Sequence, residues 1–268
     1  MTVSLARGRS ENRSRHSIGR RDLTQWATPF GRGLAERHGR LATRIGPHPA
    51  LVVSLSIGAV IATLAAIGST RIYDSVADDN GIESLDVPVL RRAMRVRSRP
   101  LDGLAAGIAR VFGPIGLPAL GLAAAGAIAA KDRSRTPVVL VVAAGIGSLL
   151  MTLGGKDVIK RHRPPKRDAI PPYEYSPSFP SGHTLNTTTL AGVLAYLLAL
   201  RQRRTGAQAA TISAAVGTSI AVGLSRVLLG AHWFTDVLVG WVSGTGWVAL
   251  IITSHRLYLT SGRNHERT

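Results

Sequence analysis

Residues 136–155 read TPVVLVVAAGIGSLLMTLGG, twenty residues without a charged side chain. A helix needs about 20 apolar residues to cross the hydrocarbon core of a bilayer, so this stretch predicts a membrane-spanning helix. Five further uncharged runs of 17 to 21 residues share its composition, rich in Ala, Gly, Ser and Thr, which favours close helix packing in lipid. These runs are 50–70, 111–130, 184–200, 205–225 and 237–254. The sequence therefore predicts an all-α bundle of six transmembrane helices with both termini on one side.

The overall composition agrees with a membrane protein. The 268 residues hold 33 Lys and Arg against 15 Asp and Glu, a net charge of +18, and no cysteine. The missing cysteines exclude a disulfide framework, a thiolate nucleophile and Cys-ligated zinc. A basic balance is typical of proteins that meet nucleic acid or an anionic membrane. Because the charges flank apolar runs and no nucleic-acid recognition module is visible, we expect membrane lipids and no nucleic acid as partners.

The sequence divides into three parts. Residues 1–44 hold ten Arg and three acids without a sustained apolar period, which predicts a flexible basic cytoplasmic tail with a short amphipathic piece around 23–34. Residues 45–256 form the predicted membrane domain. Residues 257–268 are expected to be a cytoplasmic C-terminal tail.

The connections between the runs predict how the chain lies in the membrane. Residues 71–110 are amphipathic and broken at Pro100, which predicts helices in the interface between the first and second spans. Residues 156–183 are polar and Pro-rich, which is typical of a loop. The links 131–135 and 201–204 are short and basic, so the positive-inside rule places them, and both termini, in the cytoplasm.

Three polar clusters stand at the ends of the predicted spans, all on the side opposite the termini. On this topology they face the outer side of the plasma membrane. The clusters are Lys156-Asp-Val-Ile-Lys-Arg-His-Arg-Pro164, Pro180-Ser-Gly-His183, and Ser225-Arg226 followed by His232 and Asp236.

The first and third clusters suit the binding and attack of a phosphate. Lys156, Arg163 and Arg226 supply fixed positive charge and donors that match phosphate oxygens. His232 and Asp236 are four residues apart, one helical turn. The carboxylate can therefore orient one imidazole nitrogen and leave the other free as a nucleophile.

The second cluster opens a predicted helix. The backbone N–H groups of Ser181 and Gly182 can point at an anion there, and glycine allows close approach of a ligand. His183 is a second imidazole that can donate a proton. No metal site is predicted, because only two acids, Asp236 and Glu266, follow Glu174 in the sequence.

Each cluster alone has a simpler explanation. Basic residues after a span are commonly interfacial anchors. His162 is expected at the surface, and Pro-Ser-Gly on its own could be a plain helix start. Only the joint occurrence at three successive span ends favours a catalytic interpretation. The anchor explanation is kept for four basic residues: Lys160, Arg161, Lys166 and Arg167.

The clusters resemble the motifs of the type-2 phosphatidic acid phosphatase superfamily, which are Lys-x6-Arg-Pro, Pro-Ser-Gly-His and Ser-Arg-x5-His-x3-Asp. All eleven specified residues are present in order, within a resemblance over about residues 45–256. It implies that His232 attacks phosphorus to form a phosphohistidine, Asp236 holds its ring and His183 protonates the leaving oxygen. The residues that the resemblance assigns to the phosphoryl oxygens are Lys156, Arg163, Ser181, Gly182 and Arg226.

The resemblance implies a lipid phosphate phosphatase without a cofactor and leaves the lipid open. The candidates are polyprenyl diphosphate, phosphatidylglycerophosphate, phosphatidic acid and diacylglycerol diphosphate. We favour a polyprenyl diphosphate, as in undecaprenyl carrier-lipid recycling. A vanadium-dependent haloperoxidase shares a similar anion site but is typically soluble, and the six apolar runs argue against it. A non-catalytic lipid-binding protein would be expected to have lost the nucleophile, yet His232 and Asp236 are both present.

Overall fold

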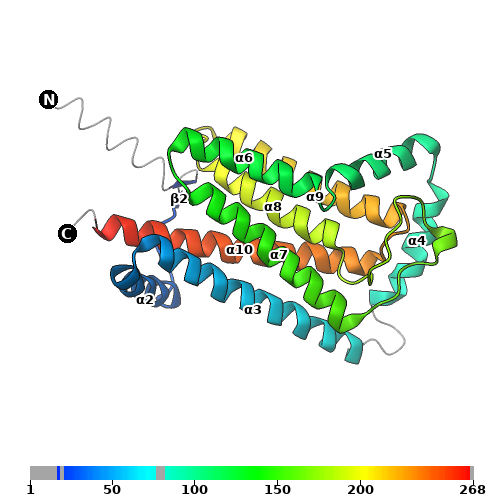
Figure 1. Cartoon of the computed structure of the whole chain (residues 1–268), viewed down its shortest axis with the longest axis horizontal. Helices are drawn as coiled ribbons and strands as arrows, with labels where there is room; N and C mark the ends of the chain where they lie inside the picture. Colours follow the sequence, from blue (N-terminus) through cyan, green and yellow to red (C-terminus); the bar gives the residue numbers. More distant parts are fainter. Residues whose placement is uncertain (1–16, 19–20, 77–81, 266–268) are drawn as a thin grey trace.

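The computed structural model describes residues 17–18, 21–76 and 82–265. Its long helices lie side by side in an elongated bundle (Figure 1). The core joins apolar side chains from several of them, with Leu140, Leu185 and Trp247 among the buried residues. The long helices are α3 (Pro47–Val76), α6 (Gly116–Asp132), α7 (Thr136–Ile159), α8 (Gly182–Ala199), α9 (Thr205–Leu228) and α10 (Phe234–His265).

The bundle is that of a multi-pass membrane protein. Within the described residues, the four helices α3, α7, α9 and α10 are long and apolar enough to cross a membrane. Helix α6 meets α5 (Arg99–Val111) at a 55° bend, and the two pass the same test as one broken span. Helix α8 is not among these, because His183, Asn186 and a run of threonines lower its mean hydropathy. It nevertheless packs against α7, α9 and α10. The all-helical fold is confirmed, and the count of six spans stays a prediction.

Two glycines bring α10 against the first half of α8. A Cβ at Gly240 would lie 3.2 Å from the carbonyl oxygen of Ser181, and one at Gly244 would lie 2.8 Å from Cβ of Thr188. Small residues four apart let two helix backbones approach closely in this way. One turn before Gly240, the backbone carbonyl of Asp236 accepts a hydrogen bond from the Ser181 N–H at 3.1 Å. The glycines therefore set the start of α10 beside the start of α8.

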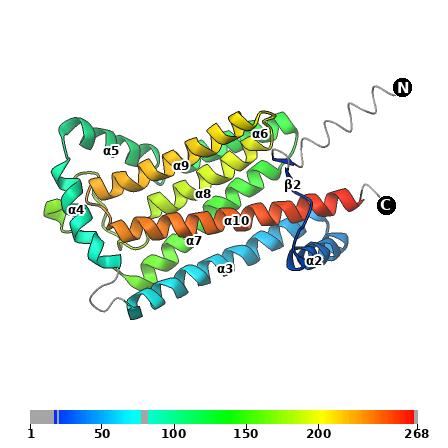
Figure 2. The ribbon, with the colours of Figure 1, turned by 180° about the vertical axis from the view of Figure 1, so that it is seen from behind.

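A short helix covers the end of the bundle at which α7 ends and α8 begins. After η1 (Ile82–Leu85), α4 (Asp86–Arg95) crosses this end, and α5 follows (Figures 1 and 2). Pro100 stands in the first turn of α5, so the predicted break falls where the structure has one. Helix α3 continues to Val76, into the stretch predicted to be interfacial. The interfacial position of α4 and α5 stays a prediction.

The loop from α7 to α8 packs on the turn between α9 and α10. It contains η2 (Lys166–Asp168). Gly230 has a φ of 65°, and a Cβ there would lie 2.5 Å from the carbonyl oxygen of Asp168. The Ile170 N–H donates to the Leu229 carbonyl at 2.8 Å, and Arg97 donates to the Asp168 carbonyl at 2.8 Å. These contacts fix the loop over the helix ends.

The opposite end of the bundle differs from the predicted tails. Strands β1 (Ser17–Ile18) and β2 (Arg21–Asp22) pair antiparallel, and α2 (Pro29–Ile45) packs against α10 (Figure 2). The side chain of Thr28 caps α2, and buried His38 contacts the Ser261 hydroxyl at 2.9 Å. Residues 29–45 and 257–265 are therefore helical, and α2 packs against α10 through a face that includes Gly31, His38 and Ala42. Residues 1–16 lie outside the described residues.

Candidate active site

Four helix ends meet at the end of the bundle that α4 covers. They are the last turns of α7 and α9 and the first turns of α8 and α10. The predicted clusters lie on these turns and on the loop between α7 and α8, so the predicted site residues are brought to one place. Four of them surround a single point and are called the anion site from here on: Arg163, His183, Arg226 and His232.

His232 presents its Nε2 to the anion site. The Arg163 guanidinium lies 3.1 Å from Nε2, and because a guanidinium only donates, Nε2 accepts. That bond leaves the ring proton on Nδ1, which lies 3.5 Å from a carboxylate oxygen of Asp236. This separation is longer than a standard hydrogen bond, and catalytic contacts of this kind often tighten only when substrate binds. Nε2 is therefore the unprotonated nitrogen, and its lone pair suits a nucleophile.

Asp236 is fully buried and held from several sides. Its carboxylate accepts from the Ser178 hydroxyl, from the Trp233 N–H at 2.9 Å and from Arg161 at 2.8 Å. These donors stabilise the ionised carboxylate and fix its orientation. Asp236 can therefore orient His232 and stabilise the imidazolium that forms when Nε2 reacts.

His183 lies on the other side of the anion site, one residue into α8. Its Nε2 donates to the Ala109 carbonyl of α5 at 3.2 Å, since a carbonyl oxygen can only accept. Its Nδ1 points to the anion site, where it lies 3.3 Å from Glu174. Nδ1 is thus the nitrogen that can give a proton to a leaving group.

Arg226 supplies buried positive charge at the end of α9. Its side chain is 0% exposed, and it pairs with Glu174 at 2.6 Å. Its Nε and one Nη have no hydrogen-bond partner within the described residues. A buried guanidinium with unused donors is costly unless a ligand brings acceptor oxygens.

Glu174 is the central residue that the sequence analysis missed. One carboxylate oxygen lies 2.6 Å from Arg226 and 3.3 Å from His183, and the other lies 2.8 Å from Arg163 and 3.5 Å from His232. In the sequence Glu174 is one acid in a Pro-rich loop, and nothing in its spacing links it to the three clusters.

The other predicted phosphate ligands stand at the edge of the site. Lys156 donates to Ser176 at 2.8 Å and to the Pro177 carbonyl at 2.7 Å, so it fastens the loop that carries Glu174. The Ser181 N–H is used by the Asp236 carbonyl and does not point at an anion. A Cβ at Gly182 would lie 2.9 Å from Thr152 of α7. This glycine is therefore required by helix packing, which corrects the expected reason for it.

Arg161 is not a surface anchor. It donates to Asp236 at 2.8 Å, to the Thr235 hydroxyl at 2.7 Å and to Asp86 at 2.7 Å. Asp86 is buried at the start of α4 and also accepts from the Thr235 N–H at 2.8 Å. The pair Arg161–Asp86 links the covering helix to the carboxylate behind His232. His162, by contrast, is exposed as predicted.

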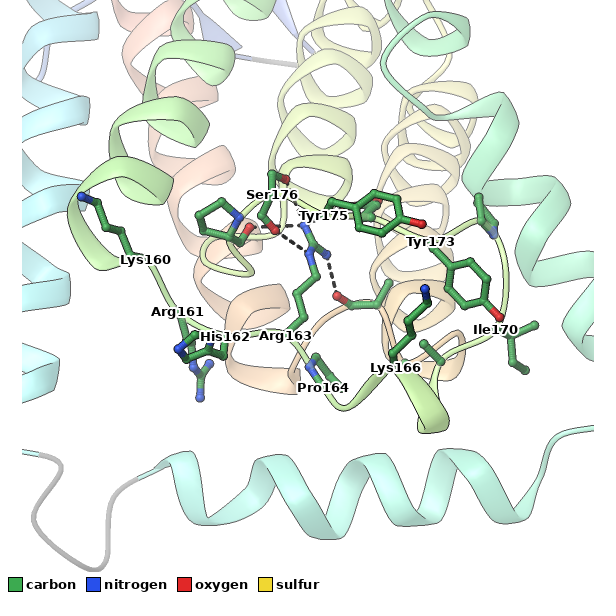
Figure 3. Close-up of a pocket in the computed structure, with 16 residues that line it drawn as sticks. Lys160, Arg161, His162, Arg163, Pro164, Lys166, Ile170, Tyr173, Tyr175 and Ser176 are labelled. Atoms are coloured by element: carbon green, nitrogen blue, oxygen red, sulfur yellow. Dashed lines mark hydrogen bonds and ion pairs between the residues drawn. The ribbon is translucent and has the colours of Figure 1, made fainter.

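A cavity of about 410 Å³ opens beside the anion site. Figure 3 shows Arg163 within it, joined to Ser176 by hydrogen bonds, with Tyr173, Tyr175 and Lys166 along one wall. The Lys166 ammonium lies 5.4 Å from the ring centre of Tyr173 and 5.7 Å from that of Tyr175. Glu174 also lines this cavity, which therefore leads to the anion site.

Comparison with known proteins bears on the fold and on residues 136–258. Residues 136–258 match the PAP2 superfamily, over a range that holds all eight predicted site residues. This stretch is therefore similar to a PAP2 superfamily domain. Phosphatidylglycerophosphatase B of Bacillus subtilis (strain 168) is 29% identical over 167 residues, which are 62% of this chain and 80% of the relative. The crystal structure of a transmembrane PAP2 type phosphatidylglycerolphosphate phosphatase from Bacillus subtilis covers 81% of this chain and 96% of that chain, with a TM-score of 0.57 and 24% identity. That structural likeness supports the fold.

The contact between Arg161 and Asp86 is expected to matter for the PAP2-like stretch although Asp86 lies outside residues 136–258. Replacing Arg161 with Gln removes the donor that holds Asp236, so we expect kcat to fall by about 10- to 100-fold with little change in KM, as when other outer partners of a functional histidine are lost. Asp86→Asn should act in the same direction. Steady-state kinetics on a lipid phosphate provides the measurement.

The matched control is Arg167→Gln, which removes an exposed arginine from the same loop. It should leave kcat unchanged, and Arg161→Lys should recover part of the loss because it keeps a charged donor. Wild-type kcat in Arg161→Gln would show that Arg161 does not position Asp236.

Proposed function

We propose that this chain is a membrane-embedded lipid phosphate phosphatase that transfers the phosphoryl group first to His232 and then to water. The observation that carries this proposal is that a buried guanidinium group with unused hydrogen-bond donors lies beside a buried histidine that can act as a nucleophile. Arg226 is fully buried with unused donors, and Nε2 of fully buried His232 faces the same point. A phosphoryl group brings the acceptor oxygens and the electrophilic phosphorus that these groups require.

In the first step, the lone pair of His232 Nε2 forms a bond to phosphorus while the bond from phosphorus to the leaving oxygen breaks. The electron pair of that bond goes to the oxygen, which takes the proton from Nδ1 of the doubly protonated His183 imidazolium, while Nε2 keeps its proton on the Ala109 carbonyl. Asp236 stabilises the positive charge on the phosphorylated imidazole. Arg163 and Arg226 bind the equatorial oxygens, where charge is spread in the transition state.

In the second step, water attacks phosphorus and the phosphorus–nitrogen bond breaks. His183, now neutral at Nδ1, accepts a proton from the water as its oxygen bonds to phosphorus. The electron pair returns to His232 Nε2, and inorganic phosphate leaves. Both histidines end in the state in which they began, so the cycle is balanced.

Phosphatidylglycerophosphate is the favoured substrate of the proposal. No residue of the sequence specifies a polyprenyl diphosphate, the lipid favoured above. The Bacillus subtilis relative is instead a phosphatidylglycerophosphatase B by name, which supports the phosphate monoester of a glycerolipid as substrate. The two substrates share a terminal phosphoryl group, so the same anion site would serve either.

The test is phosphate release by the detergent-purified protein from lipids with matched solubility. We expect the highest kcat/KM with phosphatidylglycerophosphate, lower values with phosphatidic acid and polyprenyl diphosphate, and none from the His232→Ala background control. A clear preference for polyprenyl diphosphate would overturn the substrate assignment. Failure to release phosphate from any of the lipids would overturn the proposal that the protein is a lipid phosphate phosphatase.

Catalysis is expected to proceed without a divalent metal. The carboxylates of Glu174 and Asp236 are each paired with guanidinium groups, and Arg163 and Arg226 carry the charge that a metal would bring. Activity should therefore survive EDTA, while vanadate should inhibit by binding in the anion site. An enzyme that loses activity in EDTA and regains it with Mg²⁺ would disprove this prediction.

The active site is expected to face the outer side of the membrane. The basic links 131–135 and 201–204 lie at the opposite end of the bundle, where Arg201 pairs with Asp132. The chain contains no cysteine, so single cysteines report their own accessibility. Tyr175→Cys, at a side chain that is 84% exposed beside the site, should react with an impermeant thiol reagent in intact cells. Arg203→Cys should react only after lysis, and the reverse pattern would invert the topology.

A further inference from the structure

Glu174 occupies the point at which the proposed reaction needs a phosphoryl group. Its two oxygens contact both guanidinium groups and both imidazoles of the anion site, at 2.6 to 3.5 Å. These four groups are the ones that would bind the phosphoryl oxygens, attack phosphorus and protonate the leaving oxygen. A carboxylate and a phosphoryl group cannot take the same donors at once, so the two compete for the site.

The burial of the neighbours shows that Glu174 also closes the site. The side chains of Arg226 and His232 are 0% exposed, whereas that of Glu174 is 23% exposed. Glu174 lines the 410 Å³ cavity, and Arg226 and His232 do not. The carboxylate thus stands between the cavity and the nucleophile, and a substrate that enters from the cavity meets Glu174 first.

The carboxylate is ionised at any pH at which the membrane protein would act. Burial alone raises the pKa of Glu174, but the positive charge of Arg226, paired with it at 2.6 Å, outweighs burial and holds the pKa below its usual value. The anion site is therefore balanced by one resident negative charge. An incoming anion therefore binds favourably only if it interacts more strongly with the site than the Glu174 carboxylate does.

We propose that Glu174 is a specificity-determining residue, a resident anion that a phosphate monoester displaces and a phosphodiester does not. The proposal rests on the proposed phosphatase function and adds the rule by which the site selects its lipid. Displacement needs only rotation of the Glu174 side chain toward the adjoining cavity. The loop backbone stays fastened by Lys156 and Arg163 through Ser176 and Pro177.

The selection follows from charge. The phospholipid headgroups around the protein are mainly phosphodiesters, each with one negative charge and two free oxygens. Such a group offers the anion site no more than a carboxylate does, so it gains little by displacing Glu174. A phosphate monoester brings nearly two negative charges and three free oxygens at neutral pH, which matches two guanidinium groups better. The abundant lipids are thereby kept from blocking the enzyme.

The experiment compares wild type with Glu174→Gln, which keeps the shape and removes the charge. Hydrolysis of a phosphate monoester lipid is measured in detergent micelles with increasing phosphatidylglycerol, a phosphodiester. For the wild type, phosphatidylglycerol should change the KM only because it lowers the fraction of substrate in the micelle. In Glu174→Gln the KM without phosphatidylglycerol should fall by about tenfold, because the competitor is gone, and phosphatidylglycerol should now act as a competitive inhibitor.

Two further variants keep the result interpretable. Asp157→Asn makes the same exchange of carboxylate for amide at an exposed side chain in the last turn of α7, and it should behave as wild type. Glu174→Asp keeps the charge on a shorter side chain and should give an intermediate KM, which covers the case in which Glu174→Gln does not fold. Vanadate binding, followed as a thermal shift, should strengthen in Glu174→Gln by about the same factor as KM and needs no turnover.

The outcomes separate this inference from the proposed function. Unchanged KM and continued indifference to phosphatidylglycerol in a folded Glu174→Gln or Glu174→Asp would overturn the inference and leave the phosphatase standing. A fall in kcat with KM and vanadate binding unchanged would assign Glu174 to catalysis and overturn selection. Absence of monoester hydrolysis by wild type itself would count against the proposed function.

Discussion

Replacing His232 with Ala is expected to reduce phosphate release by about four orders of magnitude or more, the scale seen when a catalytic nucleophile is removed. The reason is structural as well as chemical. His232 is fully buried, and its unprotonated Nε2 faces the anion site, where it accepts from Arg163. Phosphate release from a soluble short-chain lipid phosphate by wild type and variant provides the measurement.

His183→Ala should differ from His232→Ala, and the difference tests the two roles. A lipid alkoxide needs the proton from Nδ1, so turnover of a lipid phosphate should fall by about 10²- to 10⁴-fold. A nitrophenyl phosphate has a leaving group that needs no proton, so its first step should be less affected. Equal losses with both substrates in His183→Ala would remove His183 from the acid role, and substantial activity in His232→Ala would remove His232 from the nucleophile role.

Replacing Arg226 with Gln is the second large effect expected. We expect kcat to fall by about 10²- to 10³-fold, the cost of losing one preorganised donor to a developing negative charge. Arg226→Lys keeps the charge but loses the planar fork, so it should recover only part of the activity. A thermal unfolding measurement on each variant separates this loss from misfolding. A folded Arg226→Gln with wild-type kcat would mean that the guanidinium does not contact the phosphoryl group.

The broad architecture followed from the sequence because each element depends on its own composition. The uncharged run 136–155 predicts α7, which the structure places at Thr136–Ile159. The fourth uncharged run, 184–200, is harder to identify as a span, because α8 is less apolar than the other long helices. Its position in the bundle depends on packing against its neighbouring helices. Helix α2 begins within the predicted tail of residues 1–44, and its packing face is recognisable only once α10 is there to bury it.

The site was predictable where its residues stand at fixed spacings. The clusters around Lys156, His183 and His232 carry their own pattern, and the helix ends bring them together. Glu174 could not be predicted, because its role depends on how a loop of 22 residues, from 160 to 181, folds back over the site. Asp86 is further away still, in a segment that the sequence linked only to the membrane surface.

The most direct test of the central claim is to locate the phosphoryl group on the enzyme. The His183→Ala variant, mixed with a phosphate-labelled nitrophenyl substrate and quenched within one turnover, should accumulate the intermediate because it lacks the base for the second step. Peptide mapping is expected to find the label on the peptide that contains His232, and the double variant His183→Ala, His232→Ala should carry none. A label on another residue, or labelling that persists without His232, would contradict the account.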